Sequence, residues 1–273
     1  MKNLFTLIFI GMISVLIISC ESVADKILPE PDLSLLEDEV EIYRSYEDVD
    51  NITLEVMQAN GLGARVISSS QSLLCQAADV KVDKQTKKIT IDFGAGCTSE
   101  EGVVRKGKVL LTYSGNLAFP GSTIITSFEG YEVNGLKLEG TRFLTNTGIN
   151  LATSTITMTV KVDNGKITWS DKTFATLKMD QIREIKLGAQ GYETSVTGTG
   201  SGKSRGDYNY STLITTPLKL TQTCISSGIW VPNSGVLQFT YKGIEASVDY
   251  GSGACDKVGK VTYPGGSKDV TFD

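Results

Sequence analysis

Two short stretches of the chain carry residue types whose spacing could do chemistry. Asp92-Phe93-Gly94 matches the magnesium-binding tripeptide of protein kinases, and residues 198–204 (GTGSGKS) imitate a phosphate-binding loop. The first lacks the Gly-rich loop, strand lysine and catalytic loop of a kinase. The second has Thr197 where the phosphate loop needs its first glycine, and strand-like sequence follows it. We interpret the first match as accidental and the second stretch as a Gly-rich turn or strand edge.

The amino terminus predicts export to the cell envelope. Lys2 precedes an apolar run over residues 4–18, which is typical of a secretory signal and too short for a lasting transmembrane helix. Residues 1–19 end in Ile-Ile-Ser before Cys20, which resembles the bacterial lipobox. The resemblance implies cleavage before Cys20 and its lipidation, with acyl chains such as palmitate as the membrane anchor. The alternative is an ordinary signal peptide that contains a cysteine.

The remaining cysteines predict two disulfide bonds. Cys75, Cys97, Cys224 and Cys255 form an even set in an exported chain. Of three connectivities we favour 75–97 and 224–255, because each pair closes a local loop. One member of each pair ends an echoed sequence, ITIDFGAGC at 89–97 and ASVDYGSGAC at 246–255. The echo indicates either one stapling device used twice or two related modules, 64–150 and 151–273.

Composition excludes several kinds of active site. The chain has no histidine, which rules out Ser-His-Asp and Cys-His catalysis and removes the commonest metal ligand. Oxidised cysteines offer neither a thiolate nucleophile nor a zinc ligand. Carboxylate-pair, Ser-Lys and Tyr-based chemistry are left, and no motif marks such a site. We therefore expect no catalytic residue, no metal and no cofactor.

Charge is unevenly distributed along the chain. Residues 30–50 hold nine acidic residues and one arginine, whereas residues 51–273 hold 23 basic and 20 acidic residues. We interpret the acidic stretch as a solvated face or tether. Neither region has the clustered basic residues of a nucleic-acid binder.

Hydrophobic periodicity predicts one helical segment followed by many strands. Residues 20–32 read as a tether, and residues 33–63 have apolar side chains at helical spacing, as one helix or two broken near Asp48. From residue 64 the period falls to two, which is typical of a half-buried antiparallel sheet. Asn134-Gly135 and Asn164-Gly165 predict hairpin turns, and Lys242-Gly243 and residues 264–266 predict further turns. We expect a mainly β fold, a long antiparallel meander of about a dozen strands forming a sandwich or an extended curved sheet, with the helix packed on it.

Aromatic residues are the candidates for ligand contact. Tyr208 and Tyr210 share one strand face near the Gly-rich stretch, so we expect them to be exposed and able to stack on a sugar. For Trp169 and Trp230 core packing is the favoured role.

Several blocks of sequence resemble a known family. KITIDFGAGC, RKGKVLLTYSG and STIITSFEGYEVNGLKLEGTRFLTNTG, then KVDNGKITWSDKTF and VDYGSGACD, resemble uncharacterised lipoproteins of Bacteroidetes-type bacteria. The resemblance implies a secreted all-β domain and no particular activity, ligand or catalytic residue. In such bacteria acidic residues after the lipidated cysteine favour surface export, and Glu21 and Asp25 are compatible with that.

These observations favour a non-catalytic outer-membrane or cell-surface lipoprotein that acts as an envelope structural or interaction module. A glycan-binding or adhesin-like surface protein is the alternative, and a carboxylate-based glycan-active enzyme comes third. The expected partners are the membrane, through the lipid anchor, and an envelope protein or glycan, with no nucleic acid.

Overall fold

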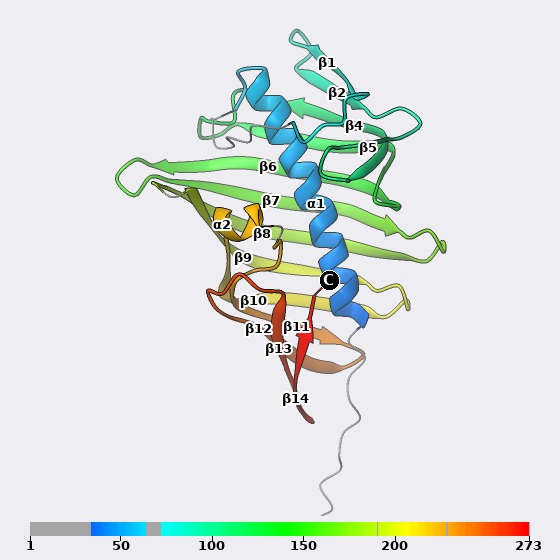
Figure 1. Cartoon of the computed structure of the whole chain (residues 1–273), viewed down its shortest axis with the longest axis vertical. Helices are drawn as coiled ribbons and strands as arrows, with labels where there is room; N and C mark the ends of the chain where they lie inside the picture. The colour runs from blue at the N-terminus through cyan, green and yellow to red at the C-terminus, as the bar shows by residue number, and fades with distance from the viewer. Residues whose placement is uncertain (1–33, 64–71, 190, 228, 273) are drawn as a thin grey trace, which may run out of the picture.

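The computed structural model describes residues 34–63, 72–189, 191–227 and 229–272. One long helix, α1 (Ser34–Ala59), lies across one face of a single open antiparallel sheet of 14 strands (Figure 1). The predicted mainly β fold with an N-terminal helix is confirmed, and the sheet is one extended sheet rather than a sandwich. The predicted signal peptide, Cys20 and the predicted tether lie outside the described residues.

The strands follow one another across the sheet in chain order, as a meander requires. A two-residue strand, β3, pairs beside β4 and lies off this path. The strands are β1 (Asp79–Asp83), β2 (Lys88–Asp92), β3 (Cys97–Thr98), β4 (Val104–Tyr113), β5 (Thr123–Val133), β6 (Leu136–Asn150), β7 (Thr155–Thr168), β8 (Phe174–Gly188), β9 (Gly191–Lys203), β10 (Asn209–Thr221), β11 (Ser234–Tyr241), β12 (Ile244–Ser252), β13 (Val258–Tyr263) and β14 (Gly266–Thr271), and a short helix, α2 (Gln222–Ser226), follows β10.

Helix α1 is unbroken at Asp48 and ends where the glycines predict. Gly61 has φ +72°, a conformation that glycine adopts without a steric penalty. The Leu62 N–H donates to the Met57 carbonyl at 2.8 Å, and the Gly61 N–H donates to the Gln58 carbonyl at 3.0 Å. These two bonds satisfy the last carbonyls of the helix in a Schellman motif.

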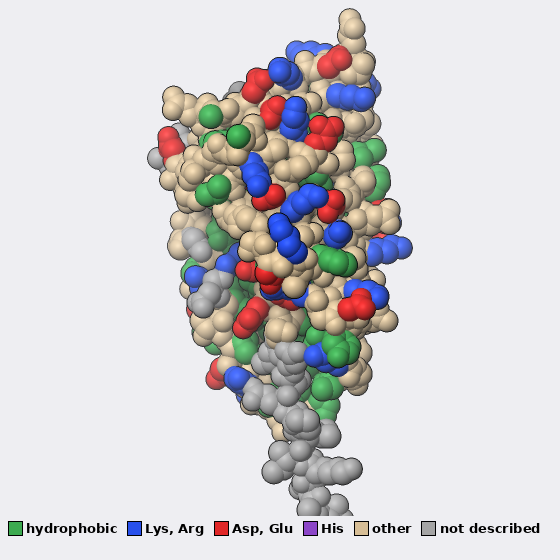
Figure 2. Space-filling model, turned by 90° about the vertical axis from the view of Figure 1, so that its right-hand side faces the viewer, with side chains coloured by type: hydrophobic (Ala, Val, Ile, Leu, Met, Phe, Trp, Pro, Cys, Tyr) green, Lys and Arg blue, Asp and Glu red, His purple; other side chains and the backbone are tan. Residues whose placement is uncertain are grey.

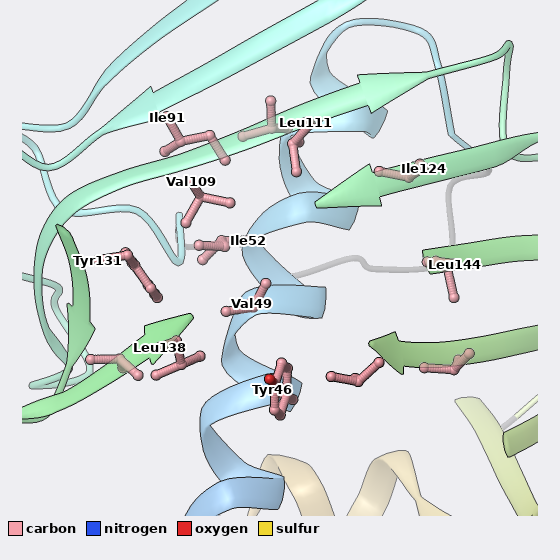
Figure 3. Close-up of a cluster of buried hydrophobic side chains, with 14 of the residues drawn as sticks. Tyr46, Val49, Ile52, Ile91, Val109, Leu111, Ile124, Tyr131, Leu138 and Leu144 are labelled. Atoms are coloured by element: carbon pink, nitrogen blue, oxygen red, sulfur yellow. The ribbon is translucent and has the colours of Figure 1, made fainter. Parts of the chain in front are cut away.

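Two clusters of buried apolar residues lie between α1 and the sheet. The first core joins Ile42 to Met57 of the helix with strands β2 and β4 to β8. Figure 3 shows Tyr46, Val49 and Ile52 pointing from the helix toward these strands. The second core joins Leu35 and Leu36 with β9 to β14. The alternating strands thus bury one face against the helix.

Turn chemistry was predicted correctly at three places and wrongly at one. Asn134-Gly135, Lys242-Gly243 and the Pro264-Gly265 pair each connect adjacent strands. Asn164-Gly165 lies inside β7, where the pairing with β8 shifts between Val162 and Gly165. Asn164 has φ +53°, so the dipeptide forms a bulge that bends a long strand instead of reversing it.

The echoed sequences have the same local structure. The Asp92 carboxylate accepts the Gly94 N–H at 2.9 Å, and the Asp249 carboxylate accepts the Gly251 N–H at 2.8 Å. Disulfides Cys75–Cys97 and Cys224–Cys255 follow, so the favoured connectivity is confirmed. The sheet does not divide at residues 150 and 151, because β6 and β7 pair along almost their whole length.

The Gly-rich stretch at 198–204 is neither a turn nor a strand edge. Its first residues belong to β9, which pairs with β8 on one side and β10 on the other. A side chain at Gly198 or Gly202 would clash with the backbone of β8, at 2.2 and 1.8 Å from carbonyl oxygens of Asp180 and Thr176. The glycines therefore allow close approach of neighbouring strands.

Candidate functional site

The centre of α1 is held by ion pairs with arginines of the sheet. Arg105 of β4 holds both carboxylate oxygens of Asp48, with its Nε 2.8 Å from Oδ2 and its second terminal nitrogen on Oδ1. The Tyr131 hydroxyl donates to the same carboxylate at 3.2 Å. Burial lowers the pKa of Arg105, but the hydrogen bonds and charge of Asp48 outweigh it and raise that pKa above its usual value.

A second group of charges centres on Asp50, two residues after Asp48 on the helix. Arg142 of β6, only 1% exposed, donates from Nε and a terminal nitrogen to Asp50 at 2.7 and 2.6 Å. Arg183 of β8 bridges Asp50 and Glu47, at 3.2 and 2.6 Å. The Arg142 guanidinium also lies 5.0 Å from the centre of the Tyr46 ring. Bidentate geometry of this kind makes the charge-assisted bonds strong.

These contacts correct the interpretation of the acidic stretch. Asp48, Asp50 and Glu47 do not form a solvated face, since each meets a largely buried arginine. A guanidinium cannot be left unpaired in an apolar interior, so the sheet arginines require carboxylates on the helix. The sequence does contain a sign of such a buried arginine. Arg105 occupies the same alternating positions of its strand as the apolar residues Val109 and Leu111, so its side chain is expected on the buried face.

A cavity of about 920 Å³ lies along α1. Six helix residues form one side of it, namely Glu41, Arg44, Ser45, Glu47, Asp48 and Asn51. The rest comes from strand ends, loops and α2, including Glu101, Asn134, Trp169, Ser170, Tyr192, Gln222, Trp230 and Lys257. This volume and mixture of aromatic, amide, hydroxyl and charged groups are typical of a ligand pocket.

Arg44 differs from the other arginines that the structure describes. Those other four all pair with carboxylates of α1, whereas Arg44 lies on the helix itself and lines the cavity. Its Nε is buried and has no hydrogen-bond partner among the described residues. One nitrogen each of Arg142 and Arg183 is in the same state, but neither of those arginines lines the cavity. A buried donor without a partner is unfavourable, and a ligand acceptor in the cavity would satisfy it.

The two tryptophans have different roles in the cavity wall. Trp169 is 8% exposed, donates from Nε1 to Glu41 at 2.5 Å, and has the Arg205 guanidinium 4.6 Å from its ring centre. It is therefore fixed as a wall and is poorly placed to stack on a ligand. Trp230 is half-buried and lines both this cavity and a smaller crevice, which makes it the better aromatic contact.

The tyrosines proposed from the sequence do not form a shared exposed platform. Tyr208 is 49% exposed, but it lies before β10 and its ring carries the Lys242 ammonium 4.4 Å from its centre. Tyr210 is 6% exposed and packs in the second core. The prediction that Tyr210 is exposed is wrong, because the inward face of β10 meets the first turns of α1.

The smaller crevice contains a buried carboxyl group. It has a volume of about 90 Å³ and is mainly apolar, with Leu36, Val40, Ile214 and Leu218 among its lining residues. Glu39 also lines it, and the Oε1 of Glu39 has no hydrogen-bond partner among the described residues. Burial raises the pKa of Glu39 to about 7. A hydrogen bond from Tyr210 lowers that pKa, but by less than burial raises it.

The described part of the chain has no group of three or more acidic, cysteine or histidine side chains arranged to hold a metal ion. Neither described helix combines the length and apolar character that crossing a membrane requires. Comparisons with protein-family models, with curated proteins and with solved structures found no match to this chain.

Proposed function

We propose that this chain is a non-catalytic interaction module of the bacterial cell envelope that binds a glycan in the cavity along α1. The observation that carries the proposal is the unpartnered Nε of Arg44 in a cavity also lined by Trp230. A sugar hydroxyl or ring oxygen can accept from Arg44, and a pyranose face can lie on an indole ring.

The charges of the cavity favour a neutral polar ligand. Asp48 is paired with Arg105 and Glu47 with Arg183, while Glu41 accepts from Trp169. Acidic and basic side chains are therefore mixed, with no excess that would select a strongly charged molecule. The surrounding amides and hydroxyls of Ser45, Asn51, Asn134, Ser170 and Gln222 offer both donors and acceptors.

The same pairings support a role without catalysis. A general acid or nucleophile needs a carboxylate whose proton or lone pair is available to the substrate. Asp48 is bound at both oxygens by a guanidinium, Glu47 is ion-paired with Arg183, and Glu41 accepts from Trp169. These carboxylates position the helix and the cavity wall.

Glycan binding is tested on an array that holds bacterial envelope and host oligosaccharides. We expect the full chain to bind above background and Arg44→Gln to weaken binding about tenfold or more, the effect of losing a charged hydrogen bond. Lys161→Gln removes the same charge from the outer face of the sheet and serves as the matched control. No binding by the unmodified chain, or equal loss in both variants, would contradict the proposal.

Anchoring at the outer membrane is a separate part of the proposal and rests on the lipobox-like sequence before Cys20. Cys20→Ala should move the protein from the membrane fraction to the soluble fraction, measured by cell fractionation and blotting. Continued membrane retention of the variant would argue against lipidation at this residue.

A further inference from the structure

One edge of the sheet carries exposed apolar side chains on loops without charge. Residues 114–123 and 147–155 contain no Lys, Arg, Asp or Glu, although such residues make up 21% of the chain. Leu151 is 87% exposed and Phe119 is 65% exposed. Ile149 and Leu187 are also exposed large apolar residues, and we call these four side chains the apolar rim.

The loops of the apolar rim are neighbours along this edge. The Gly121 N–H donates to the Asn146 carbonyl at 2.7 Å, which joins the β4–β5 loop to β6. The Leu187 N–H donates to the Ser154 carbonyl at 2.9 Å, which joins the β6–β7 loop to the end of β8. In Figure 1 the β6–β7 hairpin reaches furthest to the left, so its tip projects from the molecule.

The opposite edge of the sheet has a different composition. Its exposed apolar residues Val104, Phe174 and Tyr208 lie among charged residues. The loops there contain Glu100, Glu101, Asp171, Lys172 and Asp207. Figure 2, which faces this side, shows Lys, Arg, Asp and Glu side chains spread over its surface. Both edges are made of turns between the same strands, so the strand architecture alone does not account for the difference.

We propose that the apolar rim inserts into the interface of a lipid bilayer that contains anionic lipids. Phe119 and Leu151 stand on separate loops, and Ile149 and Leu187 stand at the ends of β6 and β8. A fluid bilayer accommodates such separate side chains without a matching protein surface. Lysines flank them: the Lys87 ammonium donates to the Ser114 carbonyl at 2.7 Å, and Lys186 is the cross-strand neighbour of Thr155. Apolar burial combined with basic residues is the usual basis of interfacial binding.

This inference does not depend on the ligand of the cavity, and it uses the proposed lipid anchor only to bring the chain to a membrane. Insertion would orient the sheet with the apolar rim toward the bilayer and the charged edge away from it. Each inserted apolar side chain should favour the bound orientation by about tenfold or more, from the free energy of burying a Leu or Phe.

The test places a fluorescent reporter on each edge of the full chain. Leu151→Trp labels the apolar rim, and Glu100→Trp labels an exposed position on the opposite edge. Each protein is reconstituted into vesicles of phosphatidylglycerol and phosphatidylcholine with brominated acyl chains, and the emission of the unmodified chain provides the background from Trp169 and Trp230. Flotation of the same samples reports membrane attachment separately.

We expect the emission of the Leu151→Trp chain to shift to the blue and to be quenched by the brominated lipid, and Glu100→Trp to remain at background. Adding Phe119→Ser and Ile149→Ser to the Leu151→Trp chain should abolish the quenching while flotation persists. Equal quenching at the two edges, or no quenching of Leu151→Trp in floated samples, would overturn the proposal.

Discussion

The two halves of the sheet hold the same helix in different ways. In the first core, residues 42–57 of α1 combine apolar packing with carboxylates bound by Arg105, Arg142 and Arg183. In the second core, Leu35 and Leu36 pack against β9 to β14, and the described residues include no basic partner for Glu39. The helix is thus held by packing and buried ion pairs at its centre, and near its start by packing and one partly exposed ion pair, between Asp38 and Arg205.

The difference between the halves does not arise from their disulfide bonds. Each half has one disulfide that follows a turn in which an aspartate accepts a glycine N–H two residues later. Since both halves share this device, the electrostatics of the helix distinguish them. Changes at the helix should therefore affect the halves differently, whereas removal of a disulfide should affect them alike.

Arg142→Ala should have the largest effect, because it leaves Asp50 buried with only Arg183 beside it. We expect the free energy of unfolding to fall by about 3–5 kcal/mol, the usual consequence of breaking a buried pair. Urea unfolding followed by circular dichroism measures this. A loss below about 1 kcal/mol would remove the claimed role of the ion pairs in the first core.

Removal of either disulfide should destabilise the chain by a similar amount. The Cys75–Cys97 and Cys224–Cys255 bonds span sequence separations of 22 and 31 residues. The chain-entropy relation then gives about 3–4 kcal/mol for each. Paired Cys→Ser variants compared in urea test this, and a large loss for one pair with none for the other would show that the halves are not stapled equally.

Glu39→Gln should stabilise the chain in a pH-dependent manner. The folded-state pKa of Glu39 is raised from 4.5 to about 7, so the folded protein binds the proton more tightly than the unfolded chain. Stability from this group is present below pH 4.5 and is lost as the pH rises to about 7. At pH 8 the variant should gain up to about 3 kcal/mol, and at pH 5 much less. Equal effects at both pH values would contradict this prediction.

The smallest effect is expected on the outer face of the sheet. Lys161 and Asp180 form an ion pair at 3.0 Å with both side chains about half exposed. Lys161→Ala should change the free energy of unfolding by less than about 1 kcal/mol, because water and salt screen exposed pairs. The same urea measurement checks it, and a loss comparable to that of Arg142→Ala would erase the distinction between buried and exposed pairs.

Much of the fold could be predicted because its signals are local. Alternation predicted the strands, Asn134-Gly135 predicted a hairpin, and the glycines after residue 60 predicted the helix end. Asn164-Gly165 shows the limit of such signals. The same dipeptide chemistry supports a two-residue turn or a bulge, and pairing of β7 with both β6 and β8 favours the bulge.

The candidate site was less predictable than the fold. Trp169 and Trp230 were noticed as aromatics, but nothing local placed them beside Arg44 in one cavity. Tyr210 was expected on the surface and lies in the second core, because exposure of a strand face depends on what covers it. Arg105 and Arg142 lie on the buried faces of their strands, but their carboxylate partners lie 57 and 92 residues away in the sequence. No local pattern could identify those partners.

By itself the sequence determined the mainly β character, the helical segment and the favoured disulfide pairs. Those features follow from backbone preference, side-chain period and short loop closure, which act over a few to a few tens of residues. Only the tertiary structure decided which carboxylate meets which arginine, which donors at α1 stay unpaired and which edge of the sheet carries the apolar rim. These depend on burial and on contacts between distant segments, since the free energy of a charge or an apolar group is set by its surroundings in space.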